Sequence, residues 1–114
     1  MISIERFREI ALSFPEIEES PHFEKASFRV NKKIVATLDL KTQIVCVKLT
    51  EIDQSAFCAF DNTIIYPVPN KWGKSGWTLI ELNKVNEETL VDAFKTAYIG
   101  IAPKRLVGLV LENG

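Results

Sequence analysis

Residues 26–49, ASFRVNKKIVATLDLKTQIVCVKL, decide the fold. Apolar and β-branched runs alternate there with short polar pairs, in the order 26–30, Asn31-Lys32, 34–40, Lys41-Thr42 and 43–49. Such runs are typical of strands, and a connection of two residues is typical of a tight turn between antiparallel neighbours. The stretch therefore predicts a three-stranded antiparallel meander.

Helical patterns lie on both sides of this meander. Ser3 can cap a first helix that Pro15 ends, because a proline ring blocks the preceding turn. Thr50 and Asp53 have the spacing of a capping box for a second helix over residues 51–60. In this second helix the apolar positions share one face, namely Ile52, Ala56, Ala59 and Phe60.

The rest of the chain predicts two more strands and two more helices. Residues 63–66 and 77–82 read as short strands, a helix follows the cap Asn86, and a last helix follows Pro103. Residues 16–25 read as a connecting segment. The predicted order is α-βββ-α-ββ-α-α, which indicates an α+β fold with an antiparallel sheet and helices packed on one of its faces.

Length and composition predict one domain over residues 1–114. Hydrophobic residues make up 46% and charged residues 25% of the chain, which is typical of globular proteins. The first residues lack the apolar stretch of a signal peptide, and no apolar run is long enough to cross a membrane. The cysteines Cys46 and Cys58 form no disulfide or zinc pattern. We therefore expect a cytoplasmic protein that has no membrane partner.

No catalytic motif occurs in the sequence. The glycine-rich, nucleophile-elbow and metalloprotease patterns are all absent, and His22 is the single histidine. The run Glu16, Glu18 and Glu19 is typical of a solvated edge rather than of a cation site. The sequence thus predicts no enzyme, no cofactor and no metal.

The most unusual stretch is residues 71–77, KWGKSGW. An exposed indole beside lysines can stack on a nucleobase while the cations meet phosphate, and glycines permit close approach to a ligand. Trp72 is the candidate for stacking, unless it pins the loop, whereas Trp77 is expected in the core. Further cations follow Pro103 at the start of the last helix, where an anion can bind free N–H groups. The predicted nucleic-acid or anion site comprises His22, Lys25, Arg29, Lys71, Trp72, Lys74, Lys104 and Arg105.

The overall charge limits how strongly such a site can bind. The net charge is -1, with 14 basic and 15 acidic residues, whereas duplex-DNA binders usually carry a basic excess. Any nucleic-acid binding is therefore expected to be weak and sensitive to salt. Two other hypotheses stay open: a protein-interaction adaptor, such as a chaperone-like homodimer, and a small-molecule pocket around His22 and Trp72.

Several motifs resemble the MmcQ/YjbR-like family in content and order. They are Ser20-Pro21-His22-Phe23, Ser27-Phe28-Arg29-Val30, Lys33-Ile34, Trp72-Gly73-Lys74-Ser75-Gly76-Trp77, Ala97-Tyr98 and Ala102-Pro103-Lys104-Arg105-Leu106. The motifs span nearly the whole chain, and the combination of WGKxGW with AYxxxAPKRL is the specific part.

The resemblance implies a small stand-alone bacterial protein with an α-βββ-α-ββ-α type of fold. That fold is described as a double-wing DNA-binding motif and is similar to secretion-chaperone and frataxin-like architectures. Most members of the family have no assigned function. DNA binding is therefore an expectation that rests on analogy of fold.

Overall fold

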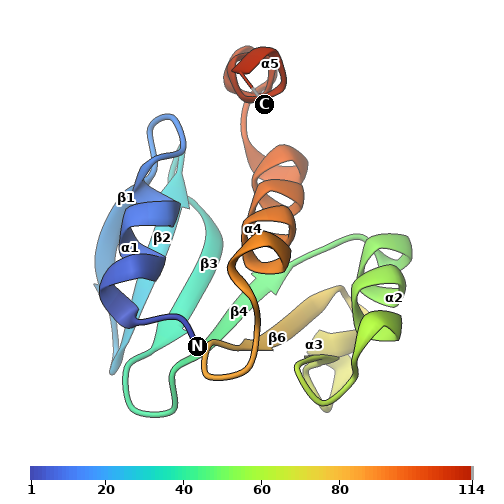
Figure 1. Ribbon diagram of the computed structural model, residues 1–114. Coiled ribbons are helices and arrows are strands. Elements are labelled where there is room, and N and C mark those ends of the chain that lie inside the picture. The colour runs from blue at the N-terminus through green and yellow to red at the C-terminus, as the bar shows by residue number, and fades with distance from the viewer. Residues whose placement is uncertain (114) are drawn as a thin grey trace.

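A six-stranded antiparallel sheet, with helices against one face, forms the body of the computed structural model, which describes residues 1–113 (Figure 1). The strands lie in the order β1-β2-β3-β4-β6-β5, with bounds β1 Glu18–His22, β2 Lys25–Val30, β3 Lys33–Asp39, β4 Ile44–Lys48, β5 Ile65–Pro67 and β6 Trp77–Glu81. The helices are α1 Ile4–Leu12, α2 Glu51–Phe60, α3 Lys71–Lys74, α4 Glu87–Ile101 and α5 Lys104–Asn113. The α+β class and the antiparallel sheet are as predicted.

Two predicted irregular segments are regular in the structure. Residues 16–25, expected to be a connection, contain β1, which pairs with β2 from Glu18↔Arg29 to His22↔Lys25. The prediction failed because Pro21 and two glutamates are poor strand formers; an edge strand tolerates proline because one of its sides needs no ladder hydrogen bond. The loop 71–77 likewise contains the short helix α3. The observed order is therefore α-ββββ-α-β-α-β-α-α.

Helix caps and turns follow the predicted local chemistry. The side chains of Ser3, Thr50 and Asn86 each accept a hydrogen bond from the backbone N–H three residues later, at 3.0, 3.1 and 2.8 Å. The turn residues Asn31 and Lys32 have φ angles of 50° and 66°, as a tight hairpin turn with two left-handed residues requires. These contacts fix where the helices begin and the register in which β2 meets β3.

The core lies between the sheet and the helices α1 and α4. Phe7 of α1 packs edge-on against Phe28 of β2 at 5.1 Å between ring centroids and against Phe94 of α4 at 6.0 Å. Tyr98 is fully buried and donates its hydroxyl hydrogen to the carbonyl oxygen of Pro15 at 2.7 Å. Burial of these large rings is the main stabilising contribution, at roughly 1.5–3 kcal/mol for each side chain.

Helix α2 is turned relative to the orientation that its apolar pattern suggests. Ile52 and Phe60 are 81% and 73% exposed, and Ala56 and Ala59 are also exposed. The side that packs on the body carries Gln54, the one buried residue of the helix, whose amide group donates hydrogen bonds to the body. The inner face therefore combines the hydrogen-bonded amide of Gln54 with the half-buried Phe57 and Cys58, and the predicted apolar face lies outside.

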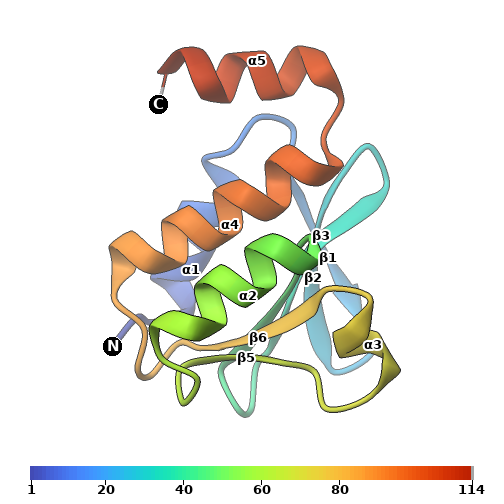
Figure 2. The same ribbon diagram turned by 90° about the vertical axis from the view of Figure 1, so that its right-hand side faces the viewer.

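Helix α5 lies beyond α4, at the end of the molecule away from β5 and α3 (Figure 2). Its Leu106 is buried, whereas Leu109 and Leu111 are exposed. None of the helices within residues 1–113 is long and apolar enough to cross a membrane.

Candidate binding site on the open face of the sheet

The helices α1, α2 and α4 leave one face of the sheet uncovered. Because side chains alternate along a strand, Thr37, Cys46 and Leu79 lie on this open face, next to one another in register across β3, β4 and β6. Their neighbours along each strand are buried against the helices. The open face is thus a surface of half-buried side chains rather than a second core.

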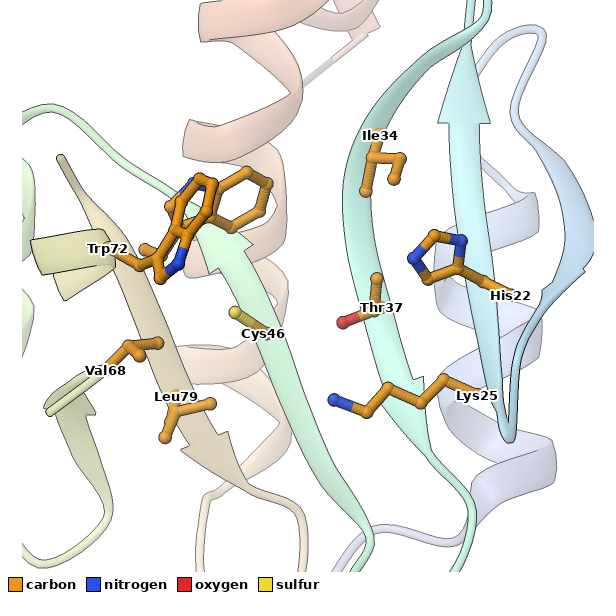
Figure 3. A pocket seen from close by; sticks show the side chains of 9 residues that line it. His22, Lys25, Ile34, Thr37, Cys46, Val68, Trp72 and Leu79 are labelled. Atoms are coloured by element: carbon orange, nitrogen blue, oxygen red, sulfur yellow. The ribbon is translucent and has the colours of Figure 1, made fainter. Parts of the chain in front are cut away.

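A hollow of about 650 Å³ lies on this open face. We call it the open-face hollow; it is lined by His22, Lys25, Ile34, Thr37, Cys46, Val68, Trp72, Trp77 and Leu79. Figure 3 shows Trp72 on one side, His22 and Lys25 on the other, and Thr37 and Cys46 between them. The hollow opens where β3 and β4 diverge, because these strands pair only from Ala36↔Val47 to Asp39↔Ile44. No carboxylate belongs to its lining.

The short helix α3 holds Trp72 at the rim of the hollow. Asn70 caps this helix, and its side-chain oxygen accepts a hydrogen bond from the Trp72 N–H at 2.8 Å. The indole itself is not packed under other side chains, because Trp72 is 56% exposed. Trp72 therefore presents a ring to solvent from a fixed backbone.

The two glycines of the KWGKSGW stretch serve packing within the protein. A β-carbon at Gly73 would overlap the carbonyl oxygen of Val68, and one at Gly76 would overlap that of Leu49. Gly76 also has a φ of 105°, which L-residues with side chains rarely adopt. The close approach expected of these glycines is thus to the protein's own backbone, and it fixes α3 against the sheet.

Gln54 of α2 also holds α3 in place against the sheet. Its Nε2 donates to the carbonyl oxygen of Gly73 at 2.9 Å and lies 3.1 Å from the hydroxyl oxygen of Thr78. Gly73 lies beside Trp72 in α3, and Thr78 lies in β6, the strand that follows α3. The contacts connect α2 to α3 and β6, so α2 positions the rim of the open-face hollow without lining it.

The opposite wall comes from the β1–β2 hairpin. His22 and Lys25 face each other in register across these strands, at the end nearest their turn. Lys25 also lies in register with Asp39 of β3. Backbone N–H groups of Thr42 and Lys41 hold the pKa of the Asp39 carboxyl below its usual value, and the charge of Lys25 adds to this effect. One carboxylate thus lies beside the hollow and partly offsets the charge of Lys25.

The other predicted site residues are distributed more widely. Lys71 and Lys74 flank Trp72 on α3, whereas Arg29 lines a neighbouring hollow with Glu16, Glu18 and Glu19. Lys104 and Arg105 begin α5, which lies at the opposite end of the molecule from α3 in both views (Figure 1, Figure 2). The expectation that all eight residues converge is therefore wrong for this last pair. Arg105 instead forms a two-bond ion pair with Glu16, at 2.8 and 3.0 Å.

Ion pairs involve only a minority of the cations among residues 1–113. Three arginines form ion pairs: Arg6 with Glu87, Arg8 with Glu19, and Arg105 with Glu16. Among residues 1–113, no ion pair involves Arg29 or any lysine other than Lys84. Two of these unpaired lysines lie at the open face, because Lys25 lines the open-face hollow and Lys48 lies beside Trp77. Lys74 lines a separate hollow with Glu51 of α2. Lys25 and Lys48 thus contribute unpaired positive charge around the open-face hollow.

Sequence reasoning missed several members of this surface. Trp77 was expected in the core but is half-buried in the lining of the hollow, and the Nζ of Lys48 lies 5.9 Å from the centroid of its ring. Cys46, which belongs to no disulfide or zinc pattern in the sequence, also lines the hollow. The available signal was the alternation along β4, which places Cys46 and Lys48 on the same side of the strand.

Comparison with known proteins identifies the family. The sequence model of the YjbR family matches residues 12–99. The chain belongs to the YjbR family. This YjbR-family chain is similar in structure to the crystal structure of Deinococcus radiodurans protein DR2400, described with a DUF419 domain, at a TM-score of 0.79 and 18% sequence identity. The similarity covers 92% of this chain and 82% of that one, and it confirms the fold. No curated protein matches the sequence.

Cys46 provides a chemical probe of the hollow in this YjbR-family chain. Burial raises the pKa of its thiol to about 11. At neutral pH roughly one thiol in ten thousand is then the reactive thiolate. We expect iodoacetamide to modify Cys46 slowly at neutral pH and faster as the pH rises toward 11, measured by mass spectrometry of the Cys46 peptide. A rate independent of pH over this range would contradict the assignment.

Proposed function

We propose that the open face binds single-stranded nucleic acid weakly and without sequence preference, and that one base stacks on Trp72. The observation that carries this proposal is the position of the 56% exposed indole. It stands across a hollow of about 650 Å³ from Lys25 and His22. A planar ring with a free face and a cation opposite suits a ligand that is both aromatic and anionic, which describes a nucleotide.

The size and lining of the hollow favour a base over a purely ionic ligand. Val68, Leu79 and Trp77 supply apolar contact area around Trp72, and Thr37 and His22 supply polar groups. Base–aromatic stacking contributes about 1–3 kcal/mol per base and tolerates any base, because each base has a π face. We therefore expect little discrimination between sequences.

The backbone of the strand would follow the free lysines. Lys71 and Lys74 flank Trp72 on α3, and Lys48 lies beside Trp77. Such a small number of phosphate contacts, in a chain of net charge -1, gives weak affinity. A duplex would be a poorer ligand, because its bases are already stacked and cannot reach the indole. In this proposal the protein binds the strand and does not catalyse a reaction on it.

The proposal is tested by titrating a short fluorescein-labelled single strand and following its anisotropy at several salt concentrations. With about three phosphate contacts, we expect log affinity to fall with log salt concentration at a slope of about -2. The intrinsic tryptophan fluorescence should be quenched over the same concentration range. The same sequence as a duplex is the comparison, and we expect it to bind less tightly.

Two results would contradict the proposal. One is the absence of binding at low salt. The other is equal affinity for the duplex and the single strand, because stacking on Trp72 then contributes nothing. As an independent readout, a saturating single strand should slow alkylation of Cys46 in the hollow and leave Cys58 on α2 unaffected.

A further inference from the structure

Phe23 presents its ring to solvent at the tip of the β1–β2 hairpin. The side chain is 95% exposed, although phenylalanine is one of the residue types that are most often buried. Its aromatic neighbour is His22, whose ring lies edge-on at 5.1 Å between ring centroids. Phe23 thus has no part in the hydrophobic core, and the stability of the fold does not explain it.

The backbone at Phe23 is unfavourable for a side chain of this size. Because His22 pairs with Lys25, the residues Phe23 and Glu24 form a two-residue hairpin loop. Phe23 has a φ of 60°, whereas the φ of Glu24 is not positive. A loop with a positive φ at its first residue alone favours glycine there, and a bulky residue in this region is an outlier. Such outliers cluster at ligand-binding sites, where the function of the side chain compensates for the strain.

The ring of Phe23 lies at the rim of the open-face hollow, on the side opposite Trp72. His22 and Lys25 line that side of the hollow (Figure 3), and the Phe23 ring lies directly beside the His22 ring. Lys25 also lines a second hollow, of about 470 Å³, and Phe23 belongs to the lining of that one. The two hollows therefore meet at Lys25, so a ligand that leaves the first hollow over His22 reaches Phe23.

The charges around Phe23 favour a base rather than a phosphate as the group that it contacts. In the second hollow Arg8 is paired with Glu19 at 3.0 Å, and Glu24 lies in the same lining as Lys25. Two carboxylates thus offset the two cations, and no positive charge is left over for a phosphate. Stacking of an uncharged base on an exposed ring needs no cation.

We propose that Phe23 is a second stacking residue for single-stranded nucleic acid, so that the strand crosses the open face from Trp72 to Phe23. This inference rests on the proposed function and extends it to the length of the ligand. The strands β6 and β1 are four strand spacings apart in the sheet, which is roughly 19 Å. Successive nucleotides of a stacked strand are about 3.4 Å apart, so the ligand is a strand of about six nucleotides rather than a single nucleotide.

The test measures binding of a fluorescein-labelled oligothymidylate of about eight nucleotides by anisotropy at low salt. Phe23→Gly and Phe23→Leu should each weaken binding about fivefold or more, because neither side chain offers a π face. Phe23→Tyr keeps a ring and should bind as the wild type does. Phe60→Ala removes a 73% exposed ring from α2, on the other side of the sheet, and should have no effect.

Stability gives an independent readout of the same residue. Glycine suits a positive φ, so Phe23→Gly should be at least as stable as the wild type in urea unfolding while it binds the strand less tightly. Lower stability of Phe23→Gly would overturn the proposal, because Phe23 would then be a structural residue. Wild-type affinity in Phe23→Leu would also overturn it, because the ring would then be an apolar contact, as for a protein partner.

The Trp72→Ala variant separates failure of this inference from failure of the proposed function. If Trp72→Ala weakens binding of the strand and Phe23→Gly does not, the strand binds at Trp72 alone, and only the second stacking residue is wrong. If the wild type does not bind the strand at low salt, the proposed function fails and this inference fails with it.

Discussion

Replacing Trp72 with alanine should weaken binding of a single-stranded oligonucleotide about tenfold or more. The estimate follows from the contribution of one stacked base, about 1–3 kcal/mol. The indole is 56% exposed and makes no side-chain hydrogen bond among residues 1–113, so the fold should be retained. Anisotropy titration of the labelled strand at low salt measures the change, and quenching of tryptophan fluorescence by the strand should decrease with it.

Phe60→Ala is the matched control for Trp72→Ala. It also removes an exposed aromatic ring, at 73% exposure, but from the outer face of α2 on the other side of the sheet. We expect it to leave the affinity for the single strand unchanged. If both variants lose affinity equally, binding is a property of exposed aromatic surface in general. If neither variant does, Trp72 is not the stacking group.

Gly76→Ala should destabilise the protein by about 3 kcal/mol. A positive φ costs a residue with a side chain roughly 1–2 kcal/mol, and overpacking against fixed atoms costs about 1–3 kcal/mol more. Both effects apply here, because φ is 105° and the added carbon would overlap the Leu49 carbonyl oxygen. That backbone cannot move freely, since the Leu49 N–H donates to the Gly76 carbonyl oxygen at 2.9 Å. Urea unfolding followed by circular dichroism measures the loss, which is a large part of the roughly 5–15 kcal/mol typical of native domains.

Gly100→Ala provides the opposite control. Gly100 lies in α4, and nothing lies within 4 Å of a β-carbon placed there. Alanine is favoured over glycine within a helix by up to about 1 kcal/mol, so this variant should be as stable as the wild type or slightly more stable. Equal losses of stability in Gly76→Ala and Gly100→Ala would show that the backbones of Leu49 and Gly76 are not in close contact.

The sequence predicted local structure well where a single physical effect dominates. The caps Ser3, Thr50 and Asn86 and the Asn31-Lys32 turn are formed as expected, because each depends on side chains within a few residues. The orientation of α2 was the main failure. An apolar stripe normally faces the core, but here the hydrogen bonds of Gln54, together with the half-buried Phe57 and Cys58, hold the opposite face of the helix inward. Those bonds join residues 19 and 24 positions apart, so no local pattern contains them.

The candidate site was predictable only in part, for the same reason. Trp72 stood out through its neighbours in sequence, but its position opposite His22 and Lys25 depends on the strand order β1-β2-β3-β4-β6-β5. The expectation that Lys104 and Arg105 join it failed because α5 lies at the far end of α4. The pairing of Arg105 with Glu16 also links segments 89 residues apart. Charge totals could not show that Arg6, Arg8 and Arg105 form ion pairs while Lys25 and Lys48 at the open face do not.

The two edge strands of the sheet also limit strand pairing between copies of this protein. The strand order places β1 at one border and β5 at the other, and each contains a proline, Pro21 and Pro67. A proline lacks the N–H that a neighbouring chain needs for pairing, and it interrupts the row of free donors along a border. Growth into fibrils by addition of strands is thereby hindered at both ends of the sheet.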